Sequence, residues 1–452
     1  MRVKYEKFKS HIRLKPVQIL ALGFAFVIFI GACLLSLPIS SAAGVSTNFL
    51  DSLFTSTSAV CVTGLVTLDT GTYWSLFGQV IIMLLIEIGG LGFMSFATLI
   101  FLLLGKKITL KERLVMQEAM NSFSLQGIVK MARYILGFTF SVQAVGALLL
   151  STQFIPDFGF KKGLFYGVFH SISGFCNAGF DLMGNFNSVT AYSGNAVVIL
   201  TLSALIVIGG LGFCVWIEVY NYRMNRKLSL NSKIVLLMTA ILIVGGTILM
   251  YLFEMKNPAT LYGRPASEQF LSATFAAISP RTAGFNSIPL ADMTLAGKFL
   301  TIVLMFIGGS SGSTAGGLKV TTTGILIIAV ISVIKGREDA EIFKKRLPKE
   351  LVYKAFAIFA ISLILVISVT MVLSIVESQA SLEYLLFEAT SAYGTVGLTL
   401  GLTQQLGVVG KIIISLTMYA GRVGPMTLAL ALGKRGSRSV AIKYPEDKIM
   451  VG

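Results

Sequence analysis

Four short segments of the sequence share one pattern, and each ends in a glycine that is followed by Leu or Phe. The glycines are Gly64, Gly179, Gly284 and Gly397, which lie 115, 105 and 113 residues apart. The octets SAVCVTGL, SGFCNAGF, ISPRTAGF and SAYGTVGL align without a gap, and none contains Asp or Glu. Because glycine tolerates positive φ, neighbouring carbonyls can turn toward one point at little steric cost. The chemistry that this set predicts is coordination of a cation by backbone oxygens.

The predicted ion-binding set comprises five positions in each segment, ending at its glycine. A ring of backbone carbonyls can replace the hydration shell of potassium, as the selectivity filters of potassium channels do. We therefore expect K⁺ to be held by backbone carbonyls at the four glycines, and we expect no catalytic residue. The full set is Val60, Cys61, Val62, Thr63, Gly64; Phe175, Cys176, Asn177, Ala178, Gly179; Pro280, Arg281, Thr282, Ala283, Gly284; and Tyr393, Gly394, Thr395, Val396, Gly397.

Short apolar segments precede the octets and are positioned to aim them. Residues 49–57, 164–172, 270–277 and 382–390 are too short to span a membrane, so we interpret them as half-membrane helices. The C-terminal end of such a helix carries about half a negative charge, which favours a cation. A second glycine motif follows each octet. It reads IGGLGF at 88–93 and 208–213, IGGS at 307–310 and YAGR at 419–422, and we interpret its small residues mainly as helix-packing contacts.

The composition places these segments in a membrane. Hydrophobic residues make up 55% of the 452 residues, charged residues only 13%, and the mean hydropathy is +0.81. Runs of about 20 apolar residues are long enough to cross a hydrocarbon core of about 30 Å. The first run follows a basic stretch but lacks a cleavage site, so we expect an uncleaved span. The runs include residues 17–37, 80–104, 234–253 and 355–376.

The basic residues that give the net charge of +16 are concentrated in a few segments of the chain, and this distribution argues against a nucleic-acid partner. Of the 37 Lys and Arg residues, 28 fall in five segments, and these segments lie between the predicted repeats. The positive-inside rule then places both termini in the cytoplasm. We expect the densest segments, 335–354 and the C-terminal tail, to dock a regulatory partner; the alternative is topogenic charge that contacts anionic lipid. The five segments are 1–15, 106–133, 223–233, 335–354 and 434–448.

The fold class that follows is an all-α membrane protein with eight transmembrane helices. They form four parallel repeats of helix, pore loop and helix around a central, pseudo-fourfold pore. Two spans per repeat leave every copy in one orientation, as a ring about the membrane normal requires. The expected organisation is an N-terminal cytoplasmic segment (1–16), repeats at 17–110, 111–230, 231–345 and 346–433, and a cytoplasmic tail (434–452). The third repeat contains an intramembrane loop at 308–324.

That loop is the long polar interruption of the third repeat, and we expect it to act as a gate below the filter. Irregular backbone at membrane depth is tolerated only inside protein or along a wet cavity. We expect Arg422 to hold the loop across the pore, the alternative being that Arg422 pairs with a fixed acid such as Glu87. The predicted gating residues are Gly308, Gly309, Ser310, Ser311, Gly312, Ser313, Thr314, Ala315, Gly316, Gly317, Lys319 and Arg422.

Other residues that could do chemistry receive structural interpretations. Arg281 is a charge inside the third octet, and Glu388 is its candidate partner behind the filter. The four cysteines show no CxxC pair, so neither a disulfide framework nor a zinc site is indicated. With two histidines in the chain, we expect a structural role for His170.

The fourfold glycine set resembles the Trk/Ktr/HKT superfamily of potassium transporters over nearly the whole chain. The chain looks most like the bacterial KtrB-type membrane subunit. The resemblance implies potassium uptake across the bacterial plasma membrane, with sodium coupling or dependence in some members, and a homodimer with one pore per subunit. It further implies a cytoplasmic ring of nucleotide-binding RCK-type regulatory subunits, with the nucleotide on that partner and no covalent cofactor on this chain. Plant members with Ser in the first repeat differ from this chain, which favours potassium over sodium.

Two rival functions remain open from the residues alone. The first is a secondary cation transporter with alternating access, in which Glu87 or another buried acid carries protons. The parallel repeats and the acid-free octets argue against it. The second is a membrane-embedded enzyme, against which the spans offer no paired carboxylates, no nucleophile with a base and no metal cluster.

Overall fold

The computed structural model describes residues 16–92, 110–119 and 127–424. These residues are mostly helical, and the strands β1 (Glu341–Ile342) and β2 (Lys345–Arg346) form one small antiparallel hairpin. The predicted N-terminal segment, apart from Pro16, and the whole predicted C-terminal tail (434–452) lie outside the described residues.

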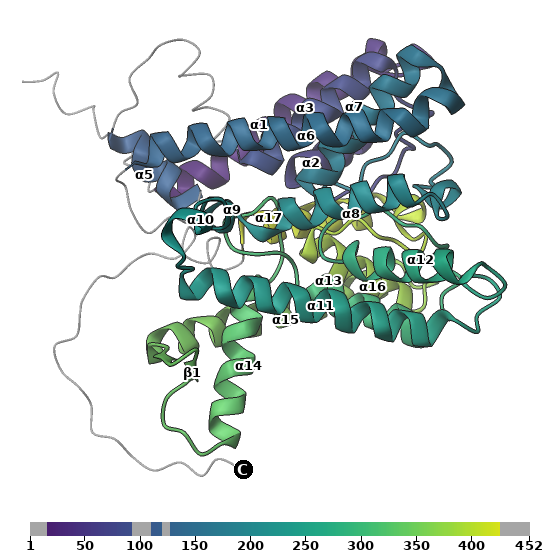
Figure 1. Cartoon of the computed structure of the whole chain (residues 1–452). Coiled ribbons are helices and arrows are strands. Elements are labelled where there is room, and N and C mark those ends of the chain that lie inside the picture. Colours follow the sequence, from purple (N-terminus) through teal and green to yellow (C-terminus); the bar gives the residue numbers. More distant parts are fainter. Residues whose placement is uncertain (1–15, 93–109, 120–126, 425–452) are drawn as a thin grey trace, which may run out of the picture.

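Four helices of the described chain are long and apolar enough to cross a membrane, and each begins one predicted repeat. They run in roughly the same direction in Figure 1. Large apolar side chains such as Phe26, Leu148 and Ile364 are exposed along them, a surface that lipid can cover. The predicted spans at 17–37, 234–253 and 355–376 are therefore confirmed to within a few residues. The helices are α1 (Pro16–Leu35), α6 (Ile128–Phe158), α11 (Leu230–Glu254) and α15 (Lys349–Val376).

A short helix leads into each glycine octet, as predicted: α2 (Phe49–Cys61), α7 (Phe160–Cys176), α12 (Ala266–Ile278) and α16 (Leu382–Gly394). Three of these helices run about one turn further than the sequence indicated, because no helix breaker precedes the filter loop. The exception is α12, which ends two residues before Pro280. Proline lacks the backbone N–H that would continue the helix.

The second helix of each repeat is short, with 16 residues in repeats 1, 2 and 4 and 12 residues in repeat 3. These helices are α3 (Leu76–Leu91), α8 (Ala196–Leu211), α13 (Leu295–Phe306) and α17 (Val408–Val423). The expectation of one continuous span over 80–104 is wrong, because α3 ends at Leu91 and Gly92 takes a φ of 79°. Gly212 and Gly424 end α8 and α17 in the same way, with φ of 96° and 90°.

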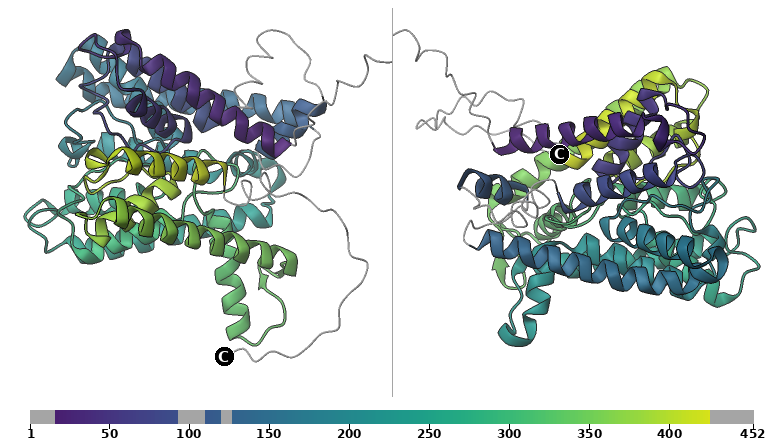
Figure 2. Two further views of the ribbon diagram at one scale, coloured as in Figure 1. Left: turned by 180° about the vertical axis from the view of Figure 1, so that it is seen from behind. Right: turned by 90° about the horizontal axis from the view of Figure 1, so that it is seen from above.

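The remaining elements lie mostly at the ends of the bundle. After α8 the chain turns by 101° into α9 (Phe213–Tyr220). The short helix α10 (Tyr222–Asn225) follows α9. Helix α14 (Val320–Ile334) runs across the direction of the long helices in Figures 1 and 2, packs against α11 and α15, and leads to the strand hairpin. The others are α5 (Leu110–Ala119), η1 (Pro38–Ser40), η2 (Thr190–Tyr192) and η3 (Thr403–Gln405).

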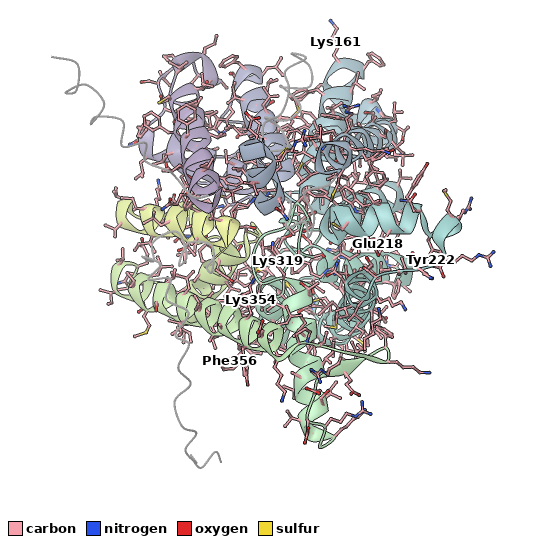
Figure 3. All side chains as sticks on the ribbon, turned by 90° about the vertical axis from the view of Figure 1, so that its left-hand side faces the viewer. Lys161, Glu218, Tyr222, Lys319, Lys354 and Phe356 are labelled. Carbon is pink, nitrogen blue, oxygen red and sulfur yellow. The ribbon has the colours of Figure 1, made fainter. Side chains whose placement is uncertain are left out.

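The four repeats close around a common centre, as predicted. In Figure 3 the purple, blue, teal and green-to-yellow parts of the chain follow one another around the middle of the molecule. The second helix of each repeat contacts the short helix of the next: α3 contacts α7, α8 contacts α12, α13 contacts α16, and α17 contacts α2. This last contact, between the end and the beginning of the chain, closes the ring.

Candidate functional site

The four predicted glycines meet in one closed ring. A Cβ built on any of them would lie closer than 3.0 Å to the carbonyl oxygen of the residue before the next glycine. Real Cβ atoms essentially never approach a carbonyl so closely, so no larger residue fits without displacing backbone. The pairs run in repeat order: Gly64 with Ala178, Gly179 with Ala283, Gly284 with Val396, and Gly397 with Thr63.

The four predicted ion-binding sets, residues 60–64, 175–179, 280–284 and 393–397, are called the filter segments below. The backbone of each filter segment is left-handed at two positions. The glycines have φ of 91°, 70°, 81° and 93°, as the sequence predicted. The residue two positions earlier is also left-handed, and sequence reasoning missed it. Three of these residues are β-branched, for which positive φ is a genuine outlier and stores strain of about 1–3 kcal/mol. They are Val62, Thr282 and Thr395, with φ of 57°, 77° and 51°, beside Asn177 at 59°.

Hydrogen bonds from the short helices hold this strained backbone. In α2 the N–H of Thr63 bonds to the carbonyl of Ser58 at 2.8 Å, a Schellman-type cap that α7 and α16 repeat. The Ser58 hydroxyl also accepts the N–H of Gly64 at 3.0 Å, and Ser391 does the same for Gly397 at 3.1 Å. Ser173 and Ser279 instead donate to the carbonyls just after their glycines, those of Phe180 and Phe285.

The predicted ion-binding residues divide into two groups. The last three residues of each set form the loop that leads to the ring. The first two residues of each set lie in the final turn of α2, α7 and α16. In repeat 3 they lie in the turn after α12. The helical carbonyls of Val60, Phe175 and Tyr393 pack against Gly89, Gly209 and Gly421 of the second helices, where a side chain would clash. Packing, as predicted, is therefore one role of these second glycine motifs.

A cavity of about 570 Å³ opens on one side of the ring and has all four glycines in its wall. Its charged lining residues are Asp69 and Asp181, which the sequence analysis did not single out. Asp69 accepts the N–H of Phe186 at 2.7 Å and so joins the loops of repeats 1 and 2. Burial raises the pKa of Asp181 to about 7; the N–H of Met183 opposes this rise in pKa, and the nearby charge of Asp69 adds to it.

The predicted gating loop packs against the other side of the filter segments. The Thr314 hydroxyl donates to the carbonyl of Phe175 at 3.3 Å. Gly316 and Gly317 lie against Thr395 and Gly394, with no room for a side chain at either position. The irregular backbone ends at Lys319 rather than at 324, because α14 begins at Val320 and takes in the polar segment 321–324 ahead of its apolar part.

Arg422 joins this loop to the first repeat. Its guanidinium donates to the carbonyl oxygens of Thr314 and Gly89, and to that of Gly90 at 3.4 Å. Among the described residues no ion pair links Arg422 to Glu87, which instead accepts hydrogen bonds from Gln143 and Cys176. Lys319, near the centre of Figure 3, folds back onto the loop, and its ammonium donates to the carbonyl of Ala315 at 2.6 Å.

The predicted pairing of Arg281 with Glu388 is wrong. Glu388 accepts hydrogen bonds from the hydroxyls of Thr399 and Thr403, which occupy both of its oxygens. Arg281 is 6% exposed, and its Nε has no partner in the described part of the chain. The alignment of the four octets placed the charge of Arg281 correctly. It could not show that two threonines that follow the fourth octet would donate hydrogen bonds to the Glu388 carboxylate.

His170 and the cysteines have structural surroundings. The His170 ring contacts the carbonyl of Tyr166 at 2.8 Å, and its other nitrogen accepts the N–H of Leu182 at 3.3 Å. The four cysteines are free thiols, and no group of three or more metal-ligating side chains occurs among the residues described.

Comparison with known proteins agrees with this architecture. Residues 15–439 match the TrkH family model, described as a cation transport protein. The chain is 47% identical to the potassium/sodium uptake protein NtpJ of Enterococcus hirae, covering 97% of this chain and 98% of that protein. It is 40% identical to the Ktr system potassium uptake protein B of Bacillus subtilis over the full length of both. The crystal structure of the potassium transporter TrkH from Vibrio parahaemolyticus shares the fold, with a TM-score of 0.70, 18% identity and coverage of 94% of this chain and 86% of that one.

Proposed function

Because the chain belongs to the TrkH family of cation transport proteins, we propose that it is the ion-translocating subunit of a potassium uptake system. The family is one of multi-pass membrane transporters and not of enzymes. The names of the Enterococcus and Bacillus relatives support K⁺ as the transported ion, and the former adds Na⁺ as a second candidate ion.

The closed ring of four glycines is the observation that carries this proposal. No hydrogen bond within the described ranges reaches the carbonyl oxygens of Thr63, Ala178, Ala283 and Val396. These four acceptors are therefore left to an ion, and the helix ends behind them favour a cation. The ring contains no carboxylate, so selectivity would rest on backbone geometry. The cavity with Asp69 and Asp181 would supply cations to the ring from the outer side.

The loop of residues 308–319 would gate this pathway. It lies against three filter segments, and Arg422 connects it to carbonyls at the end of α3. Loss of these bonds would free a segment whose glycines allow several backbone paths. Lys319 adds a positive charge beneath the filter, which opposes cation entry while the loop is in place.

A regulatory partner on the cytoplasmic side would shift the loop. The Ktr system named for the Bacillus relative supports such a partner; we propose an RCK-type ring that carries the nucleotide, a homodimer of this chain, and both termini in the cytoplasm. The strand hairpin offers exposed Lys344 and Lys345 beside the ion pair of Arg346 with Asp339 at 3.1 Å. A photo-crosslinker at Lys344 should capture the partner in native membranes; capture of lipid alone would contradict the docking proposal.

Radiotracer uptake into liposomes that hold the purified chain tests the function itself. We expect ⁸⁶Rb⁺ and K⁺ to enter down their gradients in preference to Na⁺, without accompanying proton movement. Obligatory movement of H⁺ with each cation would instead favour a coupled transporter. Gly→Ser at each of the four ring positions should reduce the preference for K⁺; four variants with unchanged preference would contradict the filter.

A further inference from the structure

The break between α8 and α9 leaves the backbone carbonyls of residues 208 to 211 without their helical partners. An uninterrupted helix would pair these four carbonyls with the N–H groups of residues 212 to 215, but the N–H of Val215 bonds to the carbonyl of Gly212 instead. Gly212 instead takes a φ of 96°, and the chain turns by 101°. Unpaired carbonyls at membrane depth cost several kcal/mol each, so their partners decide whether the break is stable.

Three of these carbonyls accept hydrogen bonds, two of them from the gating loop. The N–H of Ser310 donates to the carbonyl of Gly210 at 2.9 Å, and the N–H of Thr314 to that of Gly209 at 3.4 Å. In return, the N–H of Phe213 at the start of α9 donates to the loop carbonyl of Gly312 at 2.8 Å. The loop and the break therefore satisfy each other's backbone groups.

The third carbonyl, that of Ile208, is held by a side chain. The indole Nε1–H of Trp216 donates to it at 2.7 Å, across the break from α9 to α8. Trp216 is 7% exposed and packs against Phe175, Phe213 and Phe138, at centroid distances of 5.6, 5.0 and 4.7 Å. Phe175 belongs to the last turn of the second filter helix and accepts the Thr314 hydroxyl. One indole thus fixes the bend, the filter helix and the loop relative to one another.

Helix α9 also extends from this centre toward the edge of the molecule. In Figure 3, Lys319 lies near the middle, whereas Glu218 and Tyr222 on the segment after the break lie toward the periphery. The segment continues into the basic residues Arg223 and Arg226. A displacement of α9 would therefore reach the loop directly through the hydrogen bond from Phe213 to Gly312, and indirectly through the angle of the break.

We propose that Trp216 is a positioning residue of the gate. Its hydrogen bond to Ile208 fixes the angle between α8 and α9, which keeps the carbonyls of Gly209 and Gly210 available to the loop and the pathway closed. This inference rests on the gating function proposed above, and it adds a second anchor to that of Arg422. In repeat 1 the equivalent carbonyls of Gly89 and Gly90 accept hydrogen bonds from Arg422 instead, and both anchors reach Thr314 of the loop.

The sequence provides a matched control, because the chain contains only two tryptophans. Trp74 is also buried, but its indole nitrogen has no partner in the described structure. We expect Trp216→Phe to raise ⁸⁶Rb⁺ flux into partner-free liposomes by about two- to tenfold, the factor that one net hydrogen bond is worth. Trp74→Phe should leave the flux unchanged, and the order of ion preference should stay the same in both variants.

A second measurement leaves Trp216 in place. In the Trp74→Phe protein, Trp216 is the only tryptophan. Because Trp216 is buried, acrylamide should quench its fluorescence poorly. Deleting Ser310 to Ala315 removes the loop N–H donors, so we expect the protection of Trp216 from acrylamide to be lost. If this deletion raises the flux while Trp216→Phe leaves the flux unchanged and Trp216 stays protected, the anchor is refuted and the gate stands. If the deletion does not raise the flux, the gate itself is refuted, and the anchor with it.

Discussion

The carbonyl oxygen of Thr63 occupies the space that a side chain on Gly397 would need, so the first and last filter segments of the chain are in direct contact. Gly397 also has a φ of 93°, which other residues rarely adopt. We expect Gly397→Ser to reduce the preference for K⁺ over Na⁺ by about tenfold, or about 1.4 kcal/mol. Competitive tracer uptake in liposomes measures this ratio.

The matched control for that variant is Gly263→Ser. Gly263 has a φ of 83° in a loop, but nothing lies within 4 Å of a Cβ built there. It therefore shares the backbone strain without the clash and should keep the normal ion preference. Equal losses of preference in both variants would mean that general destabilisation, and not the ring, is responsible.

Removing the Arg422 guanidinium should weaken the gate. Arg422→Ala deletes the hydrogen bonds to Thr314 and Gly89, so we expect higher flux without the partner and an unchanged order of ion preference. Arg422→Lys keeps the charge but loses the fork of donors, and it should fall between the wild type and Ala. A flux that depends only on the charge would argue that the residue acts by repelling cations rather than by holding the loop.

The filter serines should contribute both stability and selectivity. In Ser391→Ala the N–H of Gly397 loses its buried acceptor, at a cost of about 1–3 kcal/mol. We expect a lower melting temperature for the detergent-solubilised protein and a weaker preference for K⁺. Ser374→Ala, whose exposed hydroxyl bonds only to a carbonyl of its own helix, is the comparison. Unchanged selectivity in Ser391→Ala would show that the backbone cap, in which the N–H of Val396 bonds to the carbonyl of Ser391, is enough to maintain the filter geometry.

Uptake should depend on the outer pH through Asp181. Because its pKa is raised to about 7, its carboxyl is mostly neutral at pH 6 and mostly charged at pH 8. The charged form attracts cations into the cavity, so we expect the apparent affinity for K⁺ to improve about two- to fivefold over that range. Asp181→Asn should abolish the dependence, whereas Asp292→Asn, an exposed acid outside the cavity lining, should retain it.

The repeated architecture was predictable because it depends on local patterns in the sequence. Three apolar runs marked the first helices of repeats 1, 3 and 4, and the spacing of four glycines marked the ring; both depend only on residue type and position along the chain. The positive φ of the glycines followed from the same reasoning. These features need no knowledge of which segments touch.

What could not be predicted depends on partners distant in sequence. The helix breaks at Gly92 and Gly212 are stable because Arg422 and the loop bond to the released carbonyls, and no local pattern in either helix reveals those donors. The same holds for Glu388, whose oxygens are taken by two threonines rather than by Arg281. The left-handed Val62 and Thr395 contradict their own propensities, as residues under functional strain do.

The unequal third repeat has a consequence for how such a pore could have arisen. Within residues 16–92, 110–119 and 127–424, α13 is the second helix that continues into a polar loop packed against the filter segments, and that loop contacts segments of its neighbouring repeats. A homotetramer of identical subunits would have to bring four such loops to the same axis, where they would collide. Fusion of the four quarters into one polypeptide removes that conflict, since each quarter can then diverge alone. One repeat can then carry the loop of residues 308–319 while another supplies Arg422, which bonds to it, so the proposed gate would occur once per chain.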